Sequence, residues 1–160
     1  MKILVFSDSH GKLDKMYRAV ELHKNNTDAV IFLGDGIGDF NYLRDYFTNI
    51  AFYEVKGNCD LFCGSVPNER VVSIDGIKIL ITHSHLYPPS NRYEALAKKA
   101  YDLGADAVFF GHTHQIADDI IEIEGSSIHI FNPGSVGHEG YYGVVNTSNG
   151  VLVTSHTKII

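Results

Sequence analysis

The sequence predicts an α/β fold in which two sheets pack within one domain. In the first 55 residues, short apolar segments rich in strand formers alternate with segments of helical character, which is typical of parallel strands joined by crossover helices. After residue 70, paired apolar segments flank short turns, which predicts hairpins and a mostly antiparallel second half. The chain has 160 residues and contains no linker or low-complexity tract. We therefore expect a single domain over residues 1–160.

The elements of the first half follow from the spacing of apolar residues. Buried strands are expected over residues 3–6, 29–33 and 50–55. An amphipathic helix is expected over residues 12–24, where apolar residues recur at i, i+3, i+4 and i+7: Leu13, Met16, Tyr17 and Val20. A short second helix is expected over residues 41–47.

In the second half, three pairs of strands flank short turns. The pairs are residues 70–74 with 78–82, 116–123 with 127–131, and 141–146 with 151–159. Between the first two pairs, residues 93–103 have helical periodicity and are followed by Gly104, a typical helix stop. Residues 107–110 then form another apolar segment of the buried-strand type.

Composition excludes several classes of function. Lys and Arg number 13 against 19 Asp and Glu, for a net charge of −6, so no basic surface for nucleic acid is expected. A phosphorylated substrate stays possible, because a bound metal can supply positive charge locally. Two cysteines are too few for a disulfide scaffold. The first apolar run is too short for a signal peptide and no stretch is long enough for a membrane span, so we expect a cytoplasmic protein without membrane contact.

Residues that can bind metal follow five of the apolar segments. They are Asp8 and His10, Asp35, Asn58, His83 and His85, and His112 and His114. In open α/β sheets, functional sites gather beyond the carboxyl ends of the strands, so these five loops are expected to converge. Each residue alone has an ordinary interpretation as a cap, a turn residue or a chance His-x-His pair. The joint pattern favours a metal site.

The ligand types indicate which metals the site would take. Imidazole, carboxylate and amide groups without an obvious thiolate suit Mn, Fe, Co, Ni or Zn, and disfavour a closed structural zinc site. The ligands are too many for one catalytic ion, so we expect two ions that share Asp35, whose loop lies between the others. Such a pair activates a bridging hydroxide and holds the oxygens of an in-line displacement at phosphorus. The site would keep a charge of about +1, which attracts a phosphate ester.

The ordered motifs resemble the calcineurin-like metallophosphoesterase superfamily. They are Asp8-x-His10, Gly34-Asp35, Gly57-Asn58-Cys59-Asp60, Thr82-His83-x-His85 and Gly111-His112-x-His114. The short chain, Gly57-Asn58-Cys59-Asp60 and Asn132-Pro133-Gly134-Ser135 are similar to its small YfcE-type phosphodiesterase branch. The resemblance implies a four-layer α/β/β/α sandwich of the metallo-dependent phosphatase type, and a metal-dependent phosphodiesterase (a phosphoric diester hydrolase) that acts on small phosphodiesters.

The resemblance also implies roles for individual residues. Asp8, His10 and His114 would bind the first metal, Asn58, His83 and His112 the second, and Asp35 would bridge them. Manganese is the usual activating ion of such proteins, with nickel, iron and zinc as alternatives. Many relatives carry a histidine, a candidate proton donor, where this chain has Cys59, which we interpret as a small packing residue. His85 or water is the candidate donor in its place.

Several further residues and two rival functions are weighed against this interpretation. His23 and His156 are interpreted as surface or packing residues, and His138 as a candidate cleft residue. Asp39 and Asp60 are interpreted either as acceptors that orient ligands or as turn residues.

An apolar face for a homo-oligomer is expected at Phe40, Tyr42, Phe47 and Tyr53. The rival function is a non-catalytic interaction scaffold of the same fold, like the retromer subunit. A metallo-β-lactamase is set aside, because the chain lacks its His-x-His-x-Asp-His motif.

Overall fold

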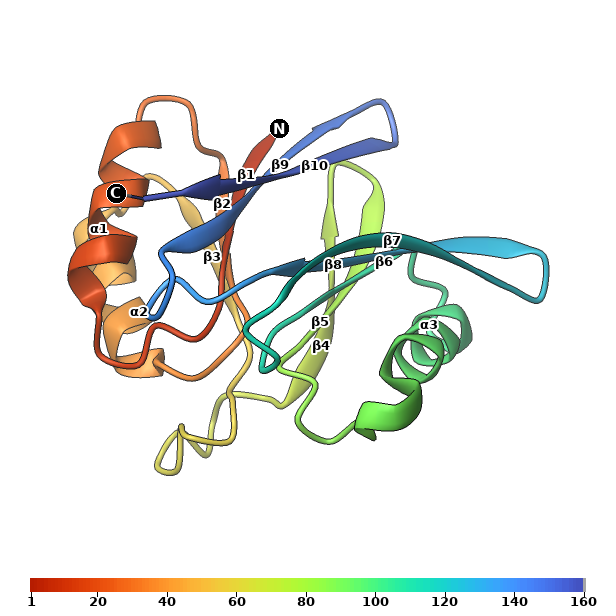
Figure 1. The fold of residues 1–160 in the computed structure, drawn as a ribbon. Helices are drawn as coiled ribbons and strands as arrows, with labels where there is room; N and C mark the ends of the chain where they lie inside the picture. Colours follow the sequence, from red (N-terminus) through yellow and green to blue (C-terminus); the bar gives the residue numbers. More distant parts are fainter. Residues whose placement is uncertain (160) are drawn as a thin grey trace.

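Two five-stranded sheets lie face to face between helices in a computed structural model that describes residues 1–159 (Figure 1). The first sheet has the order β10-β9-β1-β2-β3 and the second β4-β5-β6-β8-β7. The strands of the first sheet are β1 (Lys2–Phe6), β2 (Ala29–Phe32), β3 (Ala51–Glu54), β9 (Tyr141–Ser148) and β10 (Val151–Lys158). Those of the second are β4 (Glu69–Ile74), β5 (Ile77–Thr82), β6 (Ala107–Phe110), β7 (Ile116–Ile123) and β8 (Ser126–Pro133).

The helices complete the outer layers. They are α1 (Leu13–His23), α2 (Ile37–Tyr46), the short 3-10 helix η1 (Pro89–Asn91) and α3 (Arg92–Asp102). Figure 1 shows α1 and α2 on one side of the molecule and α3 on the other. The predicted four-layer α/β/β/α sandwich is therefore confirmed.

Strand β1 shows how the sequence builds this core. Ile3 and Val5 point to the cluster between the two sheets. Leu4 and Phe6 point to the opposite face, where they pack with Met16 and other residues of the helical layer. Because side chains alternate along a strand, a continuous apolar run places apolar groups on both faces of a sheet that is covered on both sides.

The structure differs from the expected elements in three respects. Helix α2 begins at Ile37 rather than at residue 41. The second half is less antiparallel than expected, because β6 pairs in parallel with both β5 and β8. The third hairpin, β9–β10, joins the first sheet, where β9 pairs antiparallel with β1. Hairpin signals are local and do not specify which sheet the hairpin joins.

The expected apolar oligomer face is wrong in two of its four residues. Phe40 and Phe47 are buried in the cluster between the helices and the first sheet, so they are unavailable to a partner. Tyr42 is exposed, and Tyr53 is half-buried against the core between the sheets. Within residues 1–159, no helix combines the length and apolar character needed to cross a membrane.

The carboxyl ends of the central strands from both sheets meet at one edge. In the first sheet, β1, β2 and β3 run in parallel, and the backbone N–H of Asp8 donates to the carbonyl of Gly34 at 2.9 Å. In the second sheet, β5 and β6 run in parallel, and Ser84 Oγ donates to the carbonyl of Gly111 at 3.2 Å. The loops that follow these strands carry the predicted ligands.

Candidate metal centre

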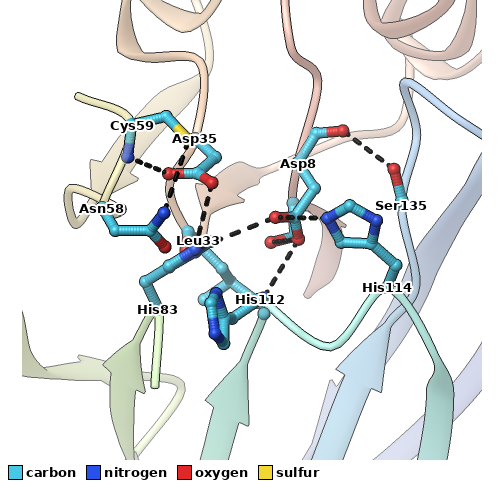
Figure 2. A network of polar contacts seen from close by, with 12 residues as sticks. Asp8, Leu33, Asp35, Asn58, Cys59, His83, His112, His114 and Ser135 are labelled. Atoms are coloured by element: carbon cyan, nitrogen blue, oxygen red, sulfur yellow. Dashed lines mark hydrogen bonds and ion pairs between the residues drawn. The ribbon is translucent and has the colours of Figure 1, made fainter. Parts of the chain in front are cut away.

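Two carboxylates and one imidazole converge at the centre of this edge (Figure 2). Asp8 follows β1, Asp35 follows β2, and His83 follows β5, so the group draws on both sheets. All three side chains are buried. The Nε2 atom of His83 lies 3.4 Å from Asp35 Oδ2 and 3.8 Å from Asp8 Oδ1. One ligand atom from each residue lies within 4.8 Å of the others.

The tautomer of His83 shows that these atoms fit a cation. Its Nδ1 donates to the carbonyl of Leu33 at 2.7 Å, which leaves Nε2 free to face the two carboxylates. Neither His83 Nε2 nor Asp8 Oδ1 has a hydrogen-bond partner although both atoms are buried. Buried polar atoms without partners are rare and costly. A divalent cation bound between them would satisfy both, so the residues present fit the metal that the ligand types predict.

Asp35 and His83 stabilise each other's charged forms. Burial acts to raise the pKa of Asp35, but the contact with His83 and the N–H of Cys59 outweigh it and hold that pKa well below its usual range. Burial acts to lower the pKa of His83, but Asp35 and Asp8 outweigh it and raise that pKa. Asp35 therefore keeps its negative charge in the buried site, ready to bind a cation.

Three further imidazoles lie beside this group. The Nε2 atom of His114 lies 3.2 Å from Asp8 Oδ1 and 3.4 Å from His10 Nε2. His10 Nε2 lies 4.0 Å from Asp35 Oδ2. The His138 ring lies 4.8 Å from the His114 ring and 5.4 Å from that of His10, measured between centroids, so His138 belongs to this group. Its sequence signal was weak because it follows no apolar segment of its own.

The remaining predicted residues lie around His83 and Asp35. The His112 ring centroid lies 5.1 Å from that of His83, and its backbone N–H donates to Asp8 Oδ2 at 3.1 Å. The ring of His85 lies 5.5 Å from that of His83, and its buried Nδ1 has no partner. Asn58 lies beside Asp35 and His83 in Figure 2. The structure thus brings all of the predicted site residues to one place.

Cys59 differs from its expected role as a packing residue. It is exposed, its Sγ accepts a hydrogen bond from Asn58 Nδ2 at 3.4 Å, and it groups with His10 and Asp35. A hydrogen bond to Asp35, together with burial, raises the pKa of Cys59 to about 11. The group is therefore a neutral thiol at physiological pH rather than a thiolate.

The loops at this edge adopt an uncommon backbone conformation. Among residues 1–159, nine residues other than glycine have positive φ. Six belong to the metal centre: Asp8, His10, Asp35, Ser84, His112 and His114. The other three lie in the turns of the β4–β5, β7–β8 and β9–β10 hairpins. Such conformations are uncommon for residues other than glycine, although Asp and His adopt them more often than most, and they concentrate at functional sites, where the surrounding structure enforces them.

The glycines that precede Asp35 and Asn58 allow two loops to approach closely. A Cβ atom on Gly57 would lie 2.0 Å from Asp35 Oδ1 and 2.6 Å from its backbone nitrogen. Gly34 has a φ of +100°, and a Cβ atom there would lie 2.6 Å from the nitrogen of Gly57. Only glycine fits at these positions, so their role is close packing against the carboxylate rather than simple turn formation.

Polar residues around the ligands hold the loops in place. Asp39 accepts hydrogen bonds from Ser9 Oγ at 2.6 Å and from the N–H of Gly11 at 2.9 Å. Ser135 Oγ donates to the carbonyl of Asp8 at 2.9 Å. Asp60 accepts from four backbone N–H groups of the Asp35 and Gly57 loops. Of the two interpretations of Asp39 and Asp60, the structure therefore supports acceptors that orient the ligand loops.

The remaining histidines lie outside the centre. His23 Nε2 lies 3.1 Å from the hydroxyl of Tyr142, and His156 Nε2 donates to the carbonyl of Asn132 at 2.8 Å. His129 Nε2 pairs with Asp118 Oδ1 at 2.7 Å. Their contacts are structural, as expected for His23 and His156.

Comparison with known proteins identifies the family. The calcineurin-like phosphoesterase superfamily domain matches residues 1–150. The chain belongs to this superfamily. Two relatives of this phosphoesterase are a probable metallophosphoesterase, YsnB, of Bacillus subtilis and the phosphodiesterase YfcE of Escherichia coli. YsnB is 32% identical, and the alignment covers 85% of this chain and 75% of YsnB. YfcE is 30% identical, and the alignment covers 95% of this chain and 90% of YfcE.

Solved structures carry the same fold. A predicted phosphoesterase from Streptococcus pneumoniae superposes with a TM-score of 0.80 at 25% identity, covering 98% of this chain and 88% of that chain. Vps29 of Entamoeba histolytica, solved with Zn²⁺, superposes with a TM-score of 0.73 at 21% identity, covering 99% of each chain. The likeness to Vps29 shows the fold alone. Members of the superfamily use divalent metals, and the buried group at the sheet edge is the corresponding candidate site.

Proposed function

We propose that this phosphoesterase hydrolyses small phosphodiesters with two divalent cations bound at the sheet edge. The observation that carries the proposal is the buried group of Asp8, Asp35 and His83, in which two buried atoms have no hydrogen-bond partner. Asp35 lies between His83 and His10, which supports its role as the shared ligand. The YfcE relative, named a phosphodiesterase, supports the choice of a diester.

The residues divide into two ligand sets around Asp35. We assign Asp8, His10 and His114 to one ion, because His114 and His10 approach Asp8 Oδ1 at 3.2 and 3.8 Å. We assign His83, His112 and Asn58 to the other, because the His83 and His112 rings are neighbours and Asn58 bonds to Cys59, whose N–H bonds to the shared Asp35. When bound, the two cations supply Lewis-acid chemistry, which makes a nucleophile of water and polarises the phosphoryl oxygens.

Backbone groups of the protein position the ligands, and a side chain is proposed to transfer the proton. The carbonyl of Leu33 holds His83 in the tautomer that offers Nε2, and the N–H of Cys59 orients Asp35 at 2.8 Å. His85 is the proposed proton donor to the leaving group, since its ring lies 6.3 Å from that of His112 and its Nδ1 is free. Manganese is the proposed ion, with nickel, iron and zinc as alternatives.

The test is metal-dependent hydrolysis of bis(p-nitrophenyl) phosphate by the metal-depleted protein. Addition of Mn²⁺ is expected to restore turnover of this diester in preference to the monoester p-nitrophenyl phosphate. Asp35→Asn and His112→Ala are expected to abolish turnover while the circular dichroism spectrum is retained. His129→Gln is the control, because His129 pairs with Asp118 outside the centre. No recovery with any of the four metals, or full activity of Asp35→Asn, would contradict the proposal.

A non-catalytic scaffold is the second candidate, because Vps29 shares the fold. The two functions differ in what the metal centre does. If the protein is a scaffold, the wild type binds metal but hydrolyses no phosphodiester. If it is the proposed enzyme, the wild type binds metal and hydrolyses the diester, and Asp35→Asn loses both properties together. Metal content measured by mass spectrometry alongside the activity assay separates them.

A further inference from the structure

A cavity of about 530 Å³ opens beside the metal centre. One wall is formed by η1 and the first turn of α3, and the opposite wall by the loop between β6 and β7. His112, one of the proposed ligands, lies in that second wall. A group bound in this cavity would therefore be next to a phosphoryl group held at the metals, and the volume suits a small organic substituent.

Arg92, the first residue of α3, lines this cavity with an unpaired charge. Its Nη2 donates to the carbonyl of Tyr87 at 3.3 Å, and its buried Nε has no partner. Among the ion pairs of the residues that the structure describes, none involves Arg92, so no carboxylate of these residues lies within 4.0 Å of its guanidinium nitrogens. A half-buried guanidinium without an anionic partner is costly, and it is the side chain that best matches a carboxylate or phosphate in a bidentate geometry.

The rest of the lining is mostly neutral and rich in hydrogen-bonding groups. Hydroxyl and amide side chains are contributed by Ser90, Asn91, Thr113 and Gln115. Glu94 also lines the cavity and is exposed. One half-buried cation, with the only carboxylate of the lining exposed, suits an occupant with a single negative charge, and the neutral groups suit an occupant with hydroxyls.

We propose that this cavity binds one arm of the phosphodiester substrate, and that it selects an arm that carries hydroxyl groups and one anionic group, which Arg92 engages. This rests on the proposed function, because the arm is part of the diester held at the metals. Arg92 would be a specificity-determining residue, and the neighbouring amides and hydroxyls would bind the hydroxyls of the arm.

Three p-nitrophenyl phosphodiesters that differ only in the second arm test the proposal. The arms are ethyl, glyceryl and glycerate, which add first hydroxyls and then a carboxylate. The wild-type enzyme is expected to show the highest kcat/KM with the glycerate ester. Arg92→Gln is expected to lose about 10–100-fold of the preference for glycerate over glyceryl, mainly through KM, and Arg92→Lys to retain part of it. Arg44→Gln, which removes an exposed arginine paired with Glu54, is expected to retain the full preference.

A binding experiment separates this inference from the proposed function. In the metal-free protein, 3-phosphoglycerate is expected to shift the amide resonances of Thr113 and Gln115, and Arg92→Gln is expected to remove these shifts. If the wild-type protein hydrolyses none of the three diesters but shows the shifts, the proposed function fails and the cavity assignment stands. Equal kcat/KM for all three diesters, an equal loss for all three in Arg92→Gln, or unshifted amides would overturn the inference.

Discussion

The side chain of Asp60 holds the backbone of Asp35, since Asp60 Oδ2 accepts a hydrogen bond of 2.8 Å from the Asp35 N–H. The same oxygen accepts from the N–H of Gly57 at 2.8 Å. The other oxygen accepts from Gly36 and Ile37 at 2.9 and 3.0 Å, at the start of α2. One carboxylate therefore ties two loops of the metal centre together, and its charge also favours the N-terminus of α2.

Asp60→Asn is expected to weaken both the fold and the metal centre. An amide offers one acceptor oxygen instead of two and removes charged hydrogen bonds that are worth about 1.5–3 kcal/mol each. We expect the free energy of unfolding to fall by about 2 kcal/mol or more, as measured by urea denaturation without metal. The affinity for Mn²⁺, measured by calorimetry, is expected to fall as well. Asp45→Asn is the control. Asp45 is exposed on α2, so this substitution is expected to change neither the stability nor the affinity for Mn²⁺. Unchanged stability and affinity in Asp60→Asn would remove this role.

Gly137→Ala is expected to displace the loop that carries His138. A Cβ atom at this position would lie 2.3 Å from the carbonyl oxygen of Ser9 and 2.7 Å from that of Asp8. Both are backbone atoms in the loop of the first ligands, so neither can move without moving that loop. We expect a loss of about 1–3 kcal/mol in the free energy of unfolding and weaker binding of Mn²⁺.

Gly38→Ala provides the matched control for this substitution. Gly38 lies in α2, and a Cβ atom there would meet nothing within 4 Å. Alanine is favoured over glycine inside a helix by about 0.5–1 kcal/mol, so this variant is expected to be as stable as the wild type or more so. Equal stability and metal affinity in Gly137→Ala and Gly38→Ala would show that the close approach is tolerated.

The sequence predicts the metal centre well because its signal is local. Each predicted ligand follows an apolar segment closely, and parallel strands bring such loops to one edge. The φ values of Asp8 and His112 are not visible in the sequence, although the glycines beside the ligands hint at tight packing. The positions of the loops could be predicted, whereas the geometry of the atoms could not.

Long-range contacts decide what the sequence left open or could not predict. Asp60 bonds to Asp35 across 25 residues, and His138 reaches His10 only because β9 pairs with β1. Arg92 reaches the cavity beside His112 because α3 packs on the second sheet. Such contacts depend on how the two sheets and their helices are arranged, which no local pattern encodes.

Bound manganese is expected to stabilise the protein against unfolding. A ligand that binds only the folded state at 100 times its Kd adds about 2.7 kcal/mol to the free energy of unfolding. In this protein the cation would also bind Asp8 Oδ1 and His83 Nε2, two buried atoms without a hydrogen-bond partner. Thermal denaturation with and without Mn²⁺ measures the effect. Asp35→Asn is expected to remove most of the increment, and an equal increment in this variant would place the ion elsewhere.

Thr154→Val is expected to raise the pKa of Asp118. The hydrogen bond between these two residues connects the two sheets. Thr154, in β10, donates to Asp118 Oδ2 of β7 at 2.6 Å. Burial acts to raise the pKa of Asp118, but the hydrogen bonds from Thr154 and His129 outweigh it and lower that pKa. Valine has the same shape as threonine and removes only the hydroxyl, so part of the lowering is lost. Titration of Asp118 followed by NMR measures the change.

The sign of the pH dependence follows from this lowered pKa. A carboxyl group whose pKa is lower in the folded state stabilises the protein above the unfolded-state value of about 3.9, and this stability is lost as the pH falls through the folded-state pKa. Thr154→Val is therefore expected to destabilise the protein more at pH 7 than below the folded-state pKa of Asp118. Thr157→Val, the same substitution on the same strand, is expected to leave the pKa of Asp118 unchanged. A destabilisation by Thr154→Val that is the same at both pH values would show that the hydroxyl contributes packing or a neutral hydrogen bond rather than stabilisation of the Asp118 charge.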